Sequence, residues 1–270
     1  DVSLHVRKGE VVGLAGLMGA GRTELAMSIF GRSYGQKISG TIKINGREVH
    51  IKDVKDAINN KLAYVSEDRK NYGLVLIKDI KWNMTLSAMR NFFSKNGVLN
   101  ENDEILAAED YKKKINIKSN SINQTVGSLS GGNQQKVVLA KWMLTQPDVL
   151  ILDEPTAGLD PKGRDEILAA IHKLHEERGI TVILVSHSME DVARLVDRII
   201  VMHKGKVAMT GTPREIFSHP MELEQMGLAA PQVSYVFAKL KEKGYDVPTD
   251  IYTVEEARDA LLKLVKQVKA

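Results

Sequence analysis

Short apolar runs, separated by stretches of helical spacing, dominate the hydrophobic pattern of this chain. Continuous apolar runs of about four to eight residues are typical of strands that are buried on both faces of a parallel sheet. The runs that fit this description are VVGLAG (11–16), LAYVSE (62–67), VLILD (149–153) and TVILVS (181–186). Helical spacing between them predicts helices from Arg22 to about Phe30, from Gly132 to about Leu144, and from Lys162 to Arg178. Strands that alternate with helices imply a parallel α/β core.

Turn signals add hairpins and helix starts to this outline. Asn45-Gly46 is the two-residue turn of a hairpin in GTIKINGREVH, and Lys204-Gly205 is the turn of another in RIIVMHKGKVAMTG. The segments 212–215 and 253–256 have the form of capping boxes. The alternating segment DVSLHVRKGE predicts a further strand that ends at Lys8-Gly9. Residues 79–117 have helical periodicity, interrupted by a turn-like segment at 95–100.

Composition narrows the class of protein. The net charge is +4, and basic and acidic residues are interleaved, which favours an ordinary solvated surface over a nucleic-acid-binding stripe. The absence of cysteine excludes disulfides and thiolate metal sites. No apolar run approaches the ~20 residues that a membrane helix needs, and no secretory signal is present. Because the first residue is not Met, we expect the sequence to be a segment of a longer chain.

A glycine-rich loop follows the first buried strand and opens a helix. Its residues are Gly16, Leu17, Met18, Gly19, Ala20, Gly21, Arg22 and Thr23. In this context backbone N–H groups can wrap a polyphosphate, and the helix dipole adds to the attraction. Thr23 is placed to give its hydroxyl to Mg²⁺, whereas Arg22 departs from the lysine of the usual pattern. A glycine-rich loop alone is a weak signal, since many are simple turns.

The stretch LSGGNQQKVVLAKWMLTQPDVLILDEPTAGLD (129–160) contains two further candidate sites. Ser130, Gly131 and Gly132 open a helix, and bare N–H groups at a helix N-terminus suit an anion. Asp153 and Glu154 end a buried strand, where a metal ligand and a base can face a bound ligand. The alternative is that the two acids are merely solvated or cap the next helix. The apolar strand before them argues against it.

In order and spacing these motifs resemble the ATPase cassettes of ATP-binding cassette (ABC) proteins. The resemblance implies that Asp153 holds Mg²⁺ and that Glu154 is the general base for the attacking water. His187, after the strand TVILVS, resembles the switch histidine that contacts the γ-phosphate. Glu67 stands where these proteins usually carry glutamine, and whether it aids the metal is open.

The same resemblance implies an ATP sandwich between two cassettes. Gly16, Gly19, Ala20, Gly21, Arg22, Thr23 and Glu67 would bind the nucleotide from one cassette. Ser130, Gly131 and Gly132 of the other cassette would then contact its γ-phosphate. Asp160 would contribute a contact at the dimer interface.

Two importer families are recognisable within the chain. Residues 1–155, with GLMGAGRTEL, YVSEDRKNYGL and LSGGNQQKVVLAKWML, resemble the second cassette of ribose/galactose-type simple-sugar importers, in which the Arg and Glu replacements occur at these two places. Residues 156–270, with VSHSMEDVARLVDRIIVMHKGKV and TGTPREIF, resemble ATPase subunits of energy-coupling factor (ECF) importers. We therefore hypothesise a composite chain joined between about Leu152 and Ala157. Such cassettes also begin with an upstream strand and an adenine-stacking aromatic residue, which the printed sequence lacks.

The resulting prediction is an α/β P-loop NTPase of the ABC-ATPase type, with a parallel core sheet, an antiparallel β edge and a helical subdomain. Residues 1–220 would form the cassette, with the helical subdomain at about 79–145, and residues 221–270 a C-terminal helical segment. The expected cofactors are ATP and Mg²⁺. The expected partners are a second cassette and an integral membrane permease, at the cytoplasmic face of the membrane, with no nucleic acid. A catalytically impaired regulatory cassette and a soluble, non-transport ABC ATPase are the alternatives.

Overall fold

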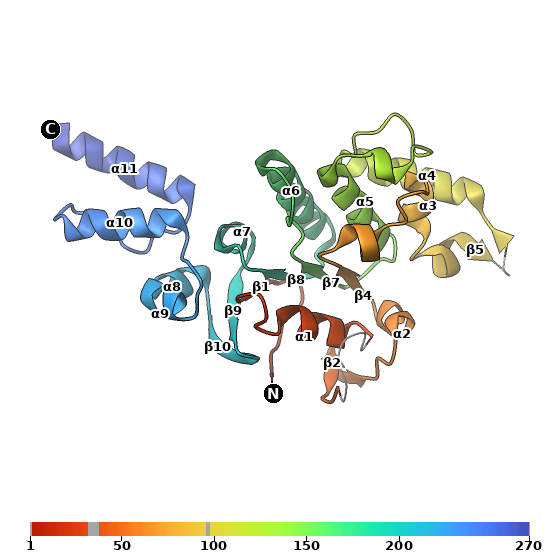
Figure 1. The fold of residues 1–270 in the computed structure, drawn as a ribbon, viewed down its shortest axis with the longest axis horizontal. Coiled ribbons are helices and arrows are strands. Elements are labelled where there is room, and N and C mark those ends of the chain that lie inside the picture. Colours follow the sequence, from red (N-terminus) through yellow and green to blue (C-terminus); the bar gives the residue numbers. More distant parts are fainter. Residues whose placement is uncertain (1, 32–37, 96–97, 270) are drawn as a thin grey trace. The chain divides into compact units, whose positions relative to one another are not determined.

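The computed structural model describes residues 2–31, 38–95 and 98–269. Its backbone divides into two units, one formed by residues 1–22 and 184–270 and the other by residues 23–183. Figure 1 labels most of their helices and strands. We describe the units one at a time.

Three neighbouring strands of the described residues lie wholly within the first unit. β1 (Val11–Ala15) is buried along its whole length and pairs in parallel with β9 (Arg198–His203), so that Val12 lies opposite Arg198. β9 continues through a tight turn into β10 (Lys206–Gly211), which pairs with it antiparallel. The turn residues Lys204 and Gly205 have φ values of 50° and 73°, the left-handed backbone that such hairpins require. The predicted hairpin is therefore confirmed.

The strand predicted at the beginning of the chain is wrong for the described residues 2–7, which form no strand. Val2, Leu4 and Val6 are half-buried and alternate with exposed neighbours, as the pattern requires. Alternation, however, specifies only which face is apolar, whereas a strand also needs a partner for its backbone groups. One backbone group of this segment is bonded by a side chain instead of a strand, since Arg198 donates from Nη2 to the His5 carbonyl oxygen at 2.6 Å.

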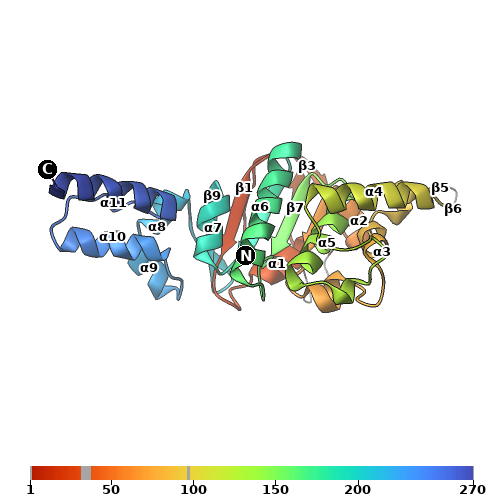
Figure 2. The same ribbon diagram turned by 90° about the horizontal axis from the view of Figure 1, so that it is seen from above.

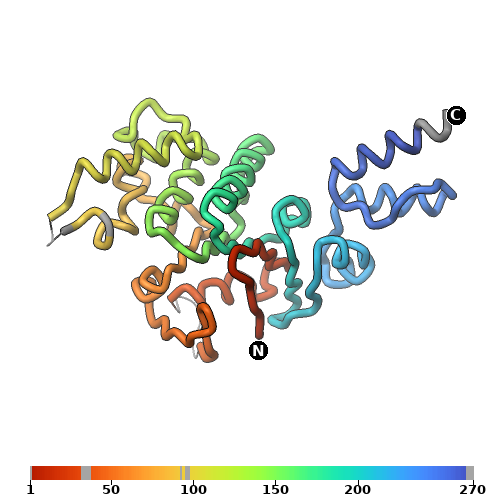
Figure 3. The backbone as a smooth tube through the Cα atoms, turned by 180° about the vertical axis from the view of Figure 1, so that it is seen from behind, coloured from red at the N-terminus to blue at the C-terminus, as the bar shows by residue number. Residues whose placement is uncertain are grey.

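Helices complete the first unit. α7 (Met189–Leu195) follows the strand β8 (Thr181–Ser186), and the capping box predicted at 212–215 is present at the start of α8 (Pro213–Phe217). The remaining helices are α9 (Pro220–Gln225), α10 (Gln232–Glu242) and α11 (Val254–Lys269). α10 and α11 run side by side, as Figure 3 shows for the blue end of the chain. Phe237 on α10 lies at the centre of their small core, with Val247, Ile251 and Ala257.

The second unit contains a parallel pair of strands. β4 (Leu62–Val65) and β7 (Val149–Asp153) pair with Leu62 opposite Val149 and Val65 opposite Leu152. β8 (Thr181–Ser186) has the predicted bounds, and it begins in this unit and ends in the other. β2 (Ile42–Ile44) and β3 (Arg47–Val49) form the other predicted hairpin, whose turn residues Asn45 and Gly46 both have positive φ.

Five of the six α-helices described in the second unit lie close to their predicted positions, and the helix at Val54–Asn59 was not predicted. The six are α1 (Arg22–Ile29), α2 (Val54–Asn59), α3 (Ile80–Thr85), α4 (Glu101–Lys114), α5 (Gly131–Met143) and α6 (Pro161–Arg178). Gly179, with φ 61°, ends α6 in the left-handed conformation. α5 and α6 lie side by side in Figure 2. The short strands β5 (Ser94–Lys95) and β6 (Val98–Leu99) pair within the segment predicted as a turn, of which residues 96 and 97 lie outside the described part.

These observations confirm the predicted fold class. The chain is α/β, with parallel strand pairs, antiparallel strands beside them and a large helical content. Among the described residues, no helix is both long and apolar enough to cross a membrane.

Candidate functional site

A fully buried carboxylate, Asp153, lies at the last position of β7 in the second unit. Thr23, near the start of α1, donates from its hydroxyl to Oδ1 at 3.1 Å. Tyr64, on β4, donates from its hydroxyl to Oδ2 at 2.7 Å. Burial raises the pKa of Asp153, and repulsion from Glu154 and Glu67 adds to the rise, while the two hydroxyl donors oppose it. The structure thus brings together Thr23 and Asp153, which are 130 positions apart in the sequence.

Tyr64 is a site residue that the sequence predictions missed. Burial raises its pKa well above the usual value, and the negative charge of Asp153 adds to this, so the phenol remains a proton donor. Its ring stacks on Phe30 at a centroid distance of 5.5 Å, and Phe30 meets Trp142 edge-on at 5.3 Å. The feature that places Tyr64 beside Asp153 is the parallel register of β4 and β7. Tyr64 lies opposite Ile151, two positions before Asp153 and on the same face of the sheet.

Glu154, the residue after β7, combines burial with an unusual backbone. Its side chain is buried, and its φ is 45°, in the left-handed region that non-glycine residues rarely occupy. Its carbonyl oxygen accepts from the N–H of Ala157 at 3.0 Å, so the chain turns sharply here. A conformation of this kind costs about 1–3 kcal/mol and is concentrated at functional sites.

The residues around Asp153 fit Mg²⁺. This ion takes oxygen ligands and is usually held by one or two protein groups together with water and substrate phosphates. The adjacent Thr23 hydroxyl and Asp153 carboxylate supply such groups. Consistent with so few protein ligands, the described residues contain no cluster of three or more His, Cys, Asp or Glu side chains able to hold a metal. Glu67 is exposed, and its charge raises the pKa of Asp153, so it adds negative potential at this place.

The glycine-rich loop between β1 and α1 belongs mostly to the first unit. Gly19 and Gly21 have φ values of 79° and 90°, so both need glycine for backbone reasons. A Cβ at Gly16 would lie 2.6 Å from the carbonyl oxygen of Met202 on β9. Close packing on β9 therefore explains this glycine without reference to a ligand.

Two further contacts fix the loop within the first unit. The N–H of Gly205, in the β9–β10 turn, donates to the carbonyl oxygen of Ala20 at 3.1 Å. The side chain of Arg22 is buried, and its Cδ lies 3.2 Å from the position of a Cβ at Gly16. The aliphatic part of Arg22 thus covers the start of the loop.

His187 is exposed and follows β8, in the first unit. The next residue, Ser188, caps α7 by accepting from the N–H of Asp191 at 3.4 Å. The role of His187 at a γ-phosphate stays a prediction.

The turn formed by residues 130–132, which we call the signature turn, begins α5 in the second unit. Ser130 is exposed, and its Oγ accepts from the side chain of Asn133 at 2.9 Å. A Cβ at Gly132 would lie 3.5 Å from the Cα of Gly163 on α6, so the two helix starts approach closely. Asp160 caps α6, since its Oδ1 accepts from the N–H of Gly163 at 3.2 Å. This gives Asp160 a structural role, and its place at a dimer interface stays a prediction.

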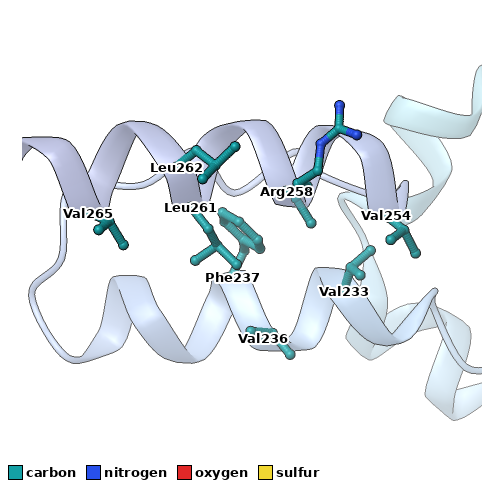
Figure 4. A pocket seen from close by; sticks show the side chains of 9 residues that line it. Val233, Val236, Phe237, Val254, Arg258, Leu261, Leu262 and Val265 are labelled. Atoms are coloured by element: carbon teal, nitrogen blue, oxygen red, sulfur yellow. The ribbon is translucent and has the colours of Figure 1, made fainter.

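An apolar groove lies apart from these residues in the sequence, between α10 and α11 (Figure 4). In Figure 4, Phe237 and Leu261 lie between the two helices. Among the described residues that line the groove, Arg258 is the one charged residue, and the groove thus shows few of the convergent polar groups that usually orient a small ligand.

Residues 1–157 match the ABC transporter family. Because this is more than half of the chain, the chain belongs to that family. Its predicted P-loop NTPase character, and its resemblance to both sugar-importer and ECF ATPases, are confirmed by the relatives described next.

Three relatives illustrate the range of similarity. The L-arabinose transport ATP-binding protein AraG of Geobacillus stearothermophilus is 50% identical over 206 residues, which are 76% of this chain and 40% of AraG. The energy-coupling factor transporter ATP-binding protein EcfA2 of Clostridium tetani is 39% identical over 272 residues, covering 98% of this chain and 89% of EcfA2. A solved structure of cbiO1 from Clostridium perfringens, part of the ABC transporter complex cbiONQ, superposes with a TM-score of 0.67 at 26% identity, covering 83% of this chain and 85% of cbiO1.

The extent of these matches bears on the hypothesis of a composite chain. The AraG match covers 76% of the chain, which is more than residues 1–155, so it continues beyond the hypothesised join. The EcfA2 match covers nearly the whole chain, on both sides of it. The join near Leu152–Ala157 therefore remains a hypothesis.

Proposed function

We propose that this chain binds and hydrolyses ATP and that the hydrolysis drives import of a small solute through a membrane permease. The observation that carries the proposal is the buried Asp153 carboxylate, hydrogen-bonded to Thr23 and followed by Glu154. A threonine hydroxyl and a carboxylate at the end of a parallel strand are the protein groups that hold Mg²⁺ in phosphoryl transfer. Magnesium, when bound, neutralises charge on the phosphate oxygens.

The chain's own residues supply the rest of the chemistry. The glycine loop binds the phosphates through backbone N–H groups, with Arg22 and the start of α1 adding positive potential. Glu154 accepts the proton of the attacking water, and His187 contacts the γ-phosphate. Tyr64 donates to Asp153 and so holds its carboxylate in one orientation. Bound nucleotide lies between this cassette and the signature turn of a second one.

We further propose a simple sugar as the solute, a homo- or heterodimer of cassettes as the assembly, and the cytoplasmic face of the membrane as its location. The AraG relative, named for L-arabinose transport, supports the sugar, although this chain spans only 40% of its length. The EcfA2 relative, which the chain nearly spans, supports uptake of an ECF-type vitamin or metal instead. Uptake assays in cells that express this chain with a simple-sugar permease or with an ECF-type permease distinguish the two.

Turnover of Mg²⁺-ATP by the full chain tests the enzymatic part. Glu154→Gln is expected to lower kcat by at least about 100-fold, because the side chain keeps its shape but loses its basicity. Asp148→Asn is the matched control, since Asp148 is an exposed acid just before the other end of β7. If Glu154→Gln leaves kcat unchanged, the catalytic assignment is wrong.

A second candidate, a regulatory cassette that binds nucleotide but hardly turns it over, is supported by Arg22 and Glu67. Arginine replaces the compact charge of lysine, and Glu67 adds negative potential near Asp153. In the same assay, a strong rise of kcat in Arg22→Lys would favour this candidate. An unchanged or lower kcat would favour the active cassette.

A further inference from the structure

The guanidinium of Arg69 lies between two segments of the proposed site, all within the second unit. Nη1 donates to the carbonyl oxygen of Ala157 at 3.1 Å, in the turn that follows Glu154. Nη2 lies only 2.8 Å from the position that a Cβ would take at Gly131, in the signature turn. One side chain thus contacts the turn after the proposed base and the start of α5.

These contacts give Gly131 a second reason to be glycine. A Cβ there would meet Arg69 Nη2 at 2.8 Å and Leu159 Cδ2 at 3.3 Å. The first distance is shorter than a real Cβ tolerates, so any larger residue displaces the guanidinium. The signature turn and Arg69 are therefore fitted to one another.

A tight turn links Arg69 to Glu67. The N–H of Arg69 donates to the carbonyl oxygen of Glu67 at 3.1 Å. Between them Asp68 accepts from the N–H groups of Lys70 and Asn71 at 3.1 Å each and from the Asn71 side chain at 2.6 Å. These bonds hold Glu67 and Arg69 together in one tight turn.

The far end of the same loop is attached to α5. Lys141, buried on α5, donates from Nζ to the carbonyl oxygen of Gly73 at 2.8 Å. A Cβ at Gly73 would lie 3.1 Å from Val138, also on α5. Residues 67–73 thus lie against the start of α5 at Arg69 and are hydrogen-bonded to α5 at Gly73.

The position of Arg69 is not what packing alone favours. Its Nε is buried and has no hydrogen-bond partner among the described residues. A buried donor without a partner destabilises the fold, and an apolar side chain of similar length avoids this cost. The presence of a guanidinium here is therefore better explained by the hydrogen bond from Nη1 to Ala157 and by the position of Nη2 beside Gly131.

We propose that Arg69 is a positioning residue that holds the signature turn and the turn after Glu154 in a fixed arrangement with Glu67. The proposal rests on the proposed function. Arg69 is not part of the glycine loop, which binds the phosphates in its own cassette, so we expect ATP to bind to a single cassette after its loss. Its loss disorders the arrangement of the signature turn and Glu154, on which the chemical step depends. The effect therefore falls on kcat rather than on KM.

Steady-state ATPase assays on the full chain test this split. Arg69→Met is expected to lower kcat at least about tenfold, with KM and the affinity for a fluorescent ATP analogue changed by less than about twofold. Arg69→Lys is expected to restore little, because an ammonium cannot both donate to Ala157 and fill the space beside Gly131 as the planar guanidinium does. Lys70→Met, an exposed neighbour in the same loop, is the control and leaves kcat unchanged. Unchanged kcat in Arg69→Met, or equal losses in kcat and affinity, overturns the proposal.

A double-mutant cycle tests the fit even if Arg69→Met folds poorly. Gly131→Ala is expected to lower the midpoint of thermal unfolding in the wild-type background and to lower it less in Arg69→Ala, where the added methyl has room. Additive shifts would overturn the proposal. If the wild-type chain does not hydrolyse ATP at all, the proposed function fails, whereas this coupling is still measurable.

Discussion

α5 and α11 are helices of similar length that are built in opposite ways. Ten of the thirteen residues of α5 are buried, and four of the ten are polar or charged: Gln134, Gln135, Lys136 and Lys141. Along α11 only Ala257 is buried among the residues whose side chains are described, while Val254, Leu262 and Val265 are exposed. The buried helix α5 thus has polar side chains in its interior, and the exposed helix α11 has apolar side chains at its surface.

The comparison shows two ways of fixing a helix. α5 is held by partners with defined geometry, because each buried lysine must reach an acceptor or pay the full cost of desolvation. Lys136 reaches Glu166 at 2.7 Å and the carbonyl oxygen of Asn116 at 3.0 Å. α11 is held by apolar contact with α10, which specifies orientation less strictly. The first kind of helix suits a site whose atoms must be placed accurately.

Among the changes to α5 and to the exposed face of α11, the largest effect is expected from Lys136, whose side chain is 2% exposed. Lys136→Ala leaves a cavity and an unpaired carbonyl oxygen at Asn116, so the free energy of unfolding should fall by about 3 kcal/mol in urea titrations. Lys118 is the matched control, since it pairs with the same Glu166 at 3.1 Å but is 56% exposed. Lys118→Ala should cost less than about 1 kcal/mol. Equal losses would mean that burial does not distinguish the two ion pairs.

Much of the fold could be predicted from the sequence. The strand at 181–186 has its predicted bounds, since burial on both faces leaves a continuous apolar run, and Gly179 ends α6 where a left-handed residue is needed. The prediction of a strand at residues 2–7 was wrong, because an alternating pattern does not show whether a pairing partner is present.

The site was less accessible to sequence reasoning. Thr23, Asp153 and Glu154 were found through motif resemblance, and the Thr23–Asp153 contact agrees with it. Tyr64 and Arg69 were missed for different physical reasons. A tyrosine within an apolar strand resembles core until the register places its hydroxyl beside a carboxylate. An arginine in a polar loop resembles surface until folding brings it against Gly131 and Ala157.

The second buried lysine of α5 predicts a dependence on pH. Burial lowers the pKa of Lys141 to about 8 from its usual 10.5. Between these values the unfolded chain holds a proton that the folded chain has released, so stability from this group rises with pH. Below pH 8 the buried Lys141 side chain is charged in the folded chain, so it lowers the free energy of unfolding by its full amount there. Lys141→Met removes this dependence, so its stability advantage over the wild type should shrink by about 2 kcal/mol between pH 7.5 and 10 in urea titrations.

An exposed lysine on α4 is the control for this measurement. Lys113→Met should leave the difference from the wild type constant over the same range, since the side chain is exposed in the folded chain. A constant difference for Lys141→Met as well would show that the charge of Lys141 is not desolvated in the folded state. The contrast between α5 and α11 would then rest on packing alone.

The smallest effect is expected on the apolar face of α11. Leu262 is 55% exposed, so Leu262→Gln should change the free energy of unfolding by less than about 0.5 kcal/mol. Phe237, on the neighbouring α10, is 0% exposed, so Phe237→Ala should lower the free energy of unfolding by about 3–4 kcal/mol. Urea titrations at two protein concentrations give both values. A loss above about 1 kcal/mol for Leu262→Gln, or a midpoint that rises with concentration in the wild type only, would mean that another molecule covers this face. In that case α11 would be fixed by partners as α5 is, and the difference between the two helices would lie only in which chain supplies them.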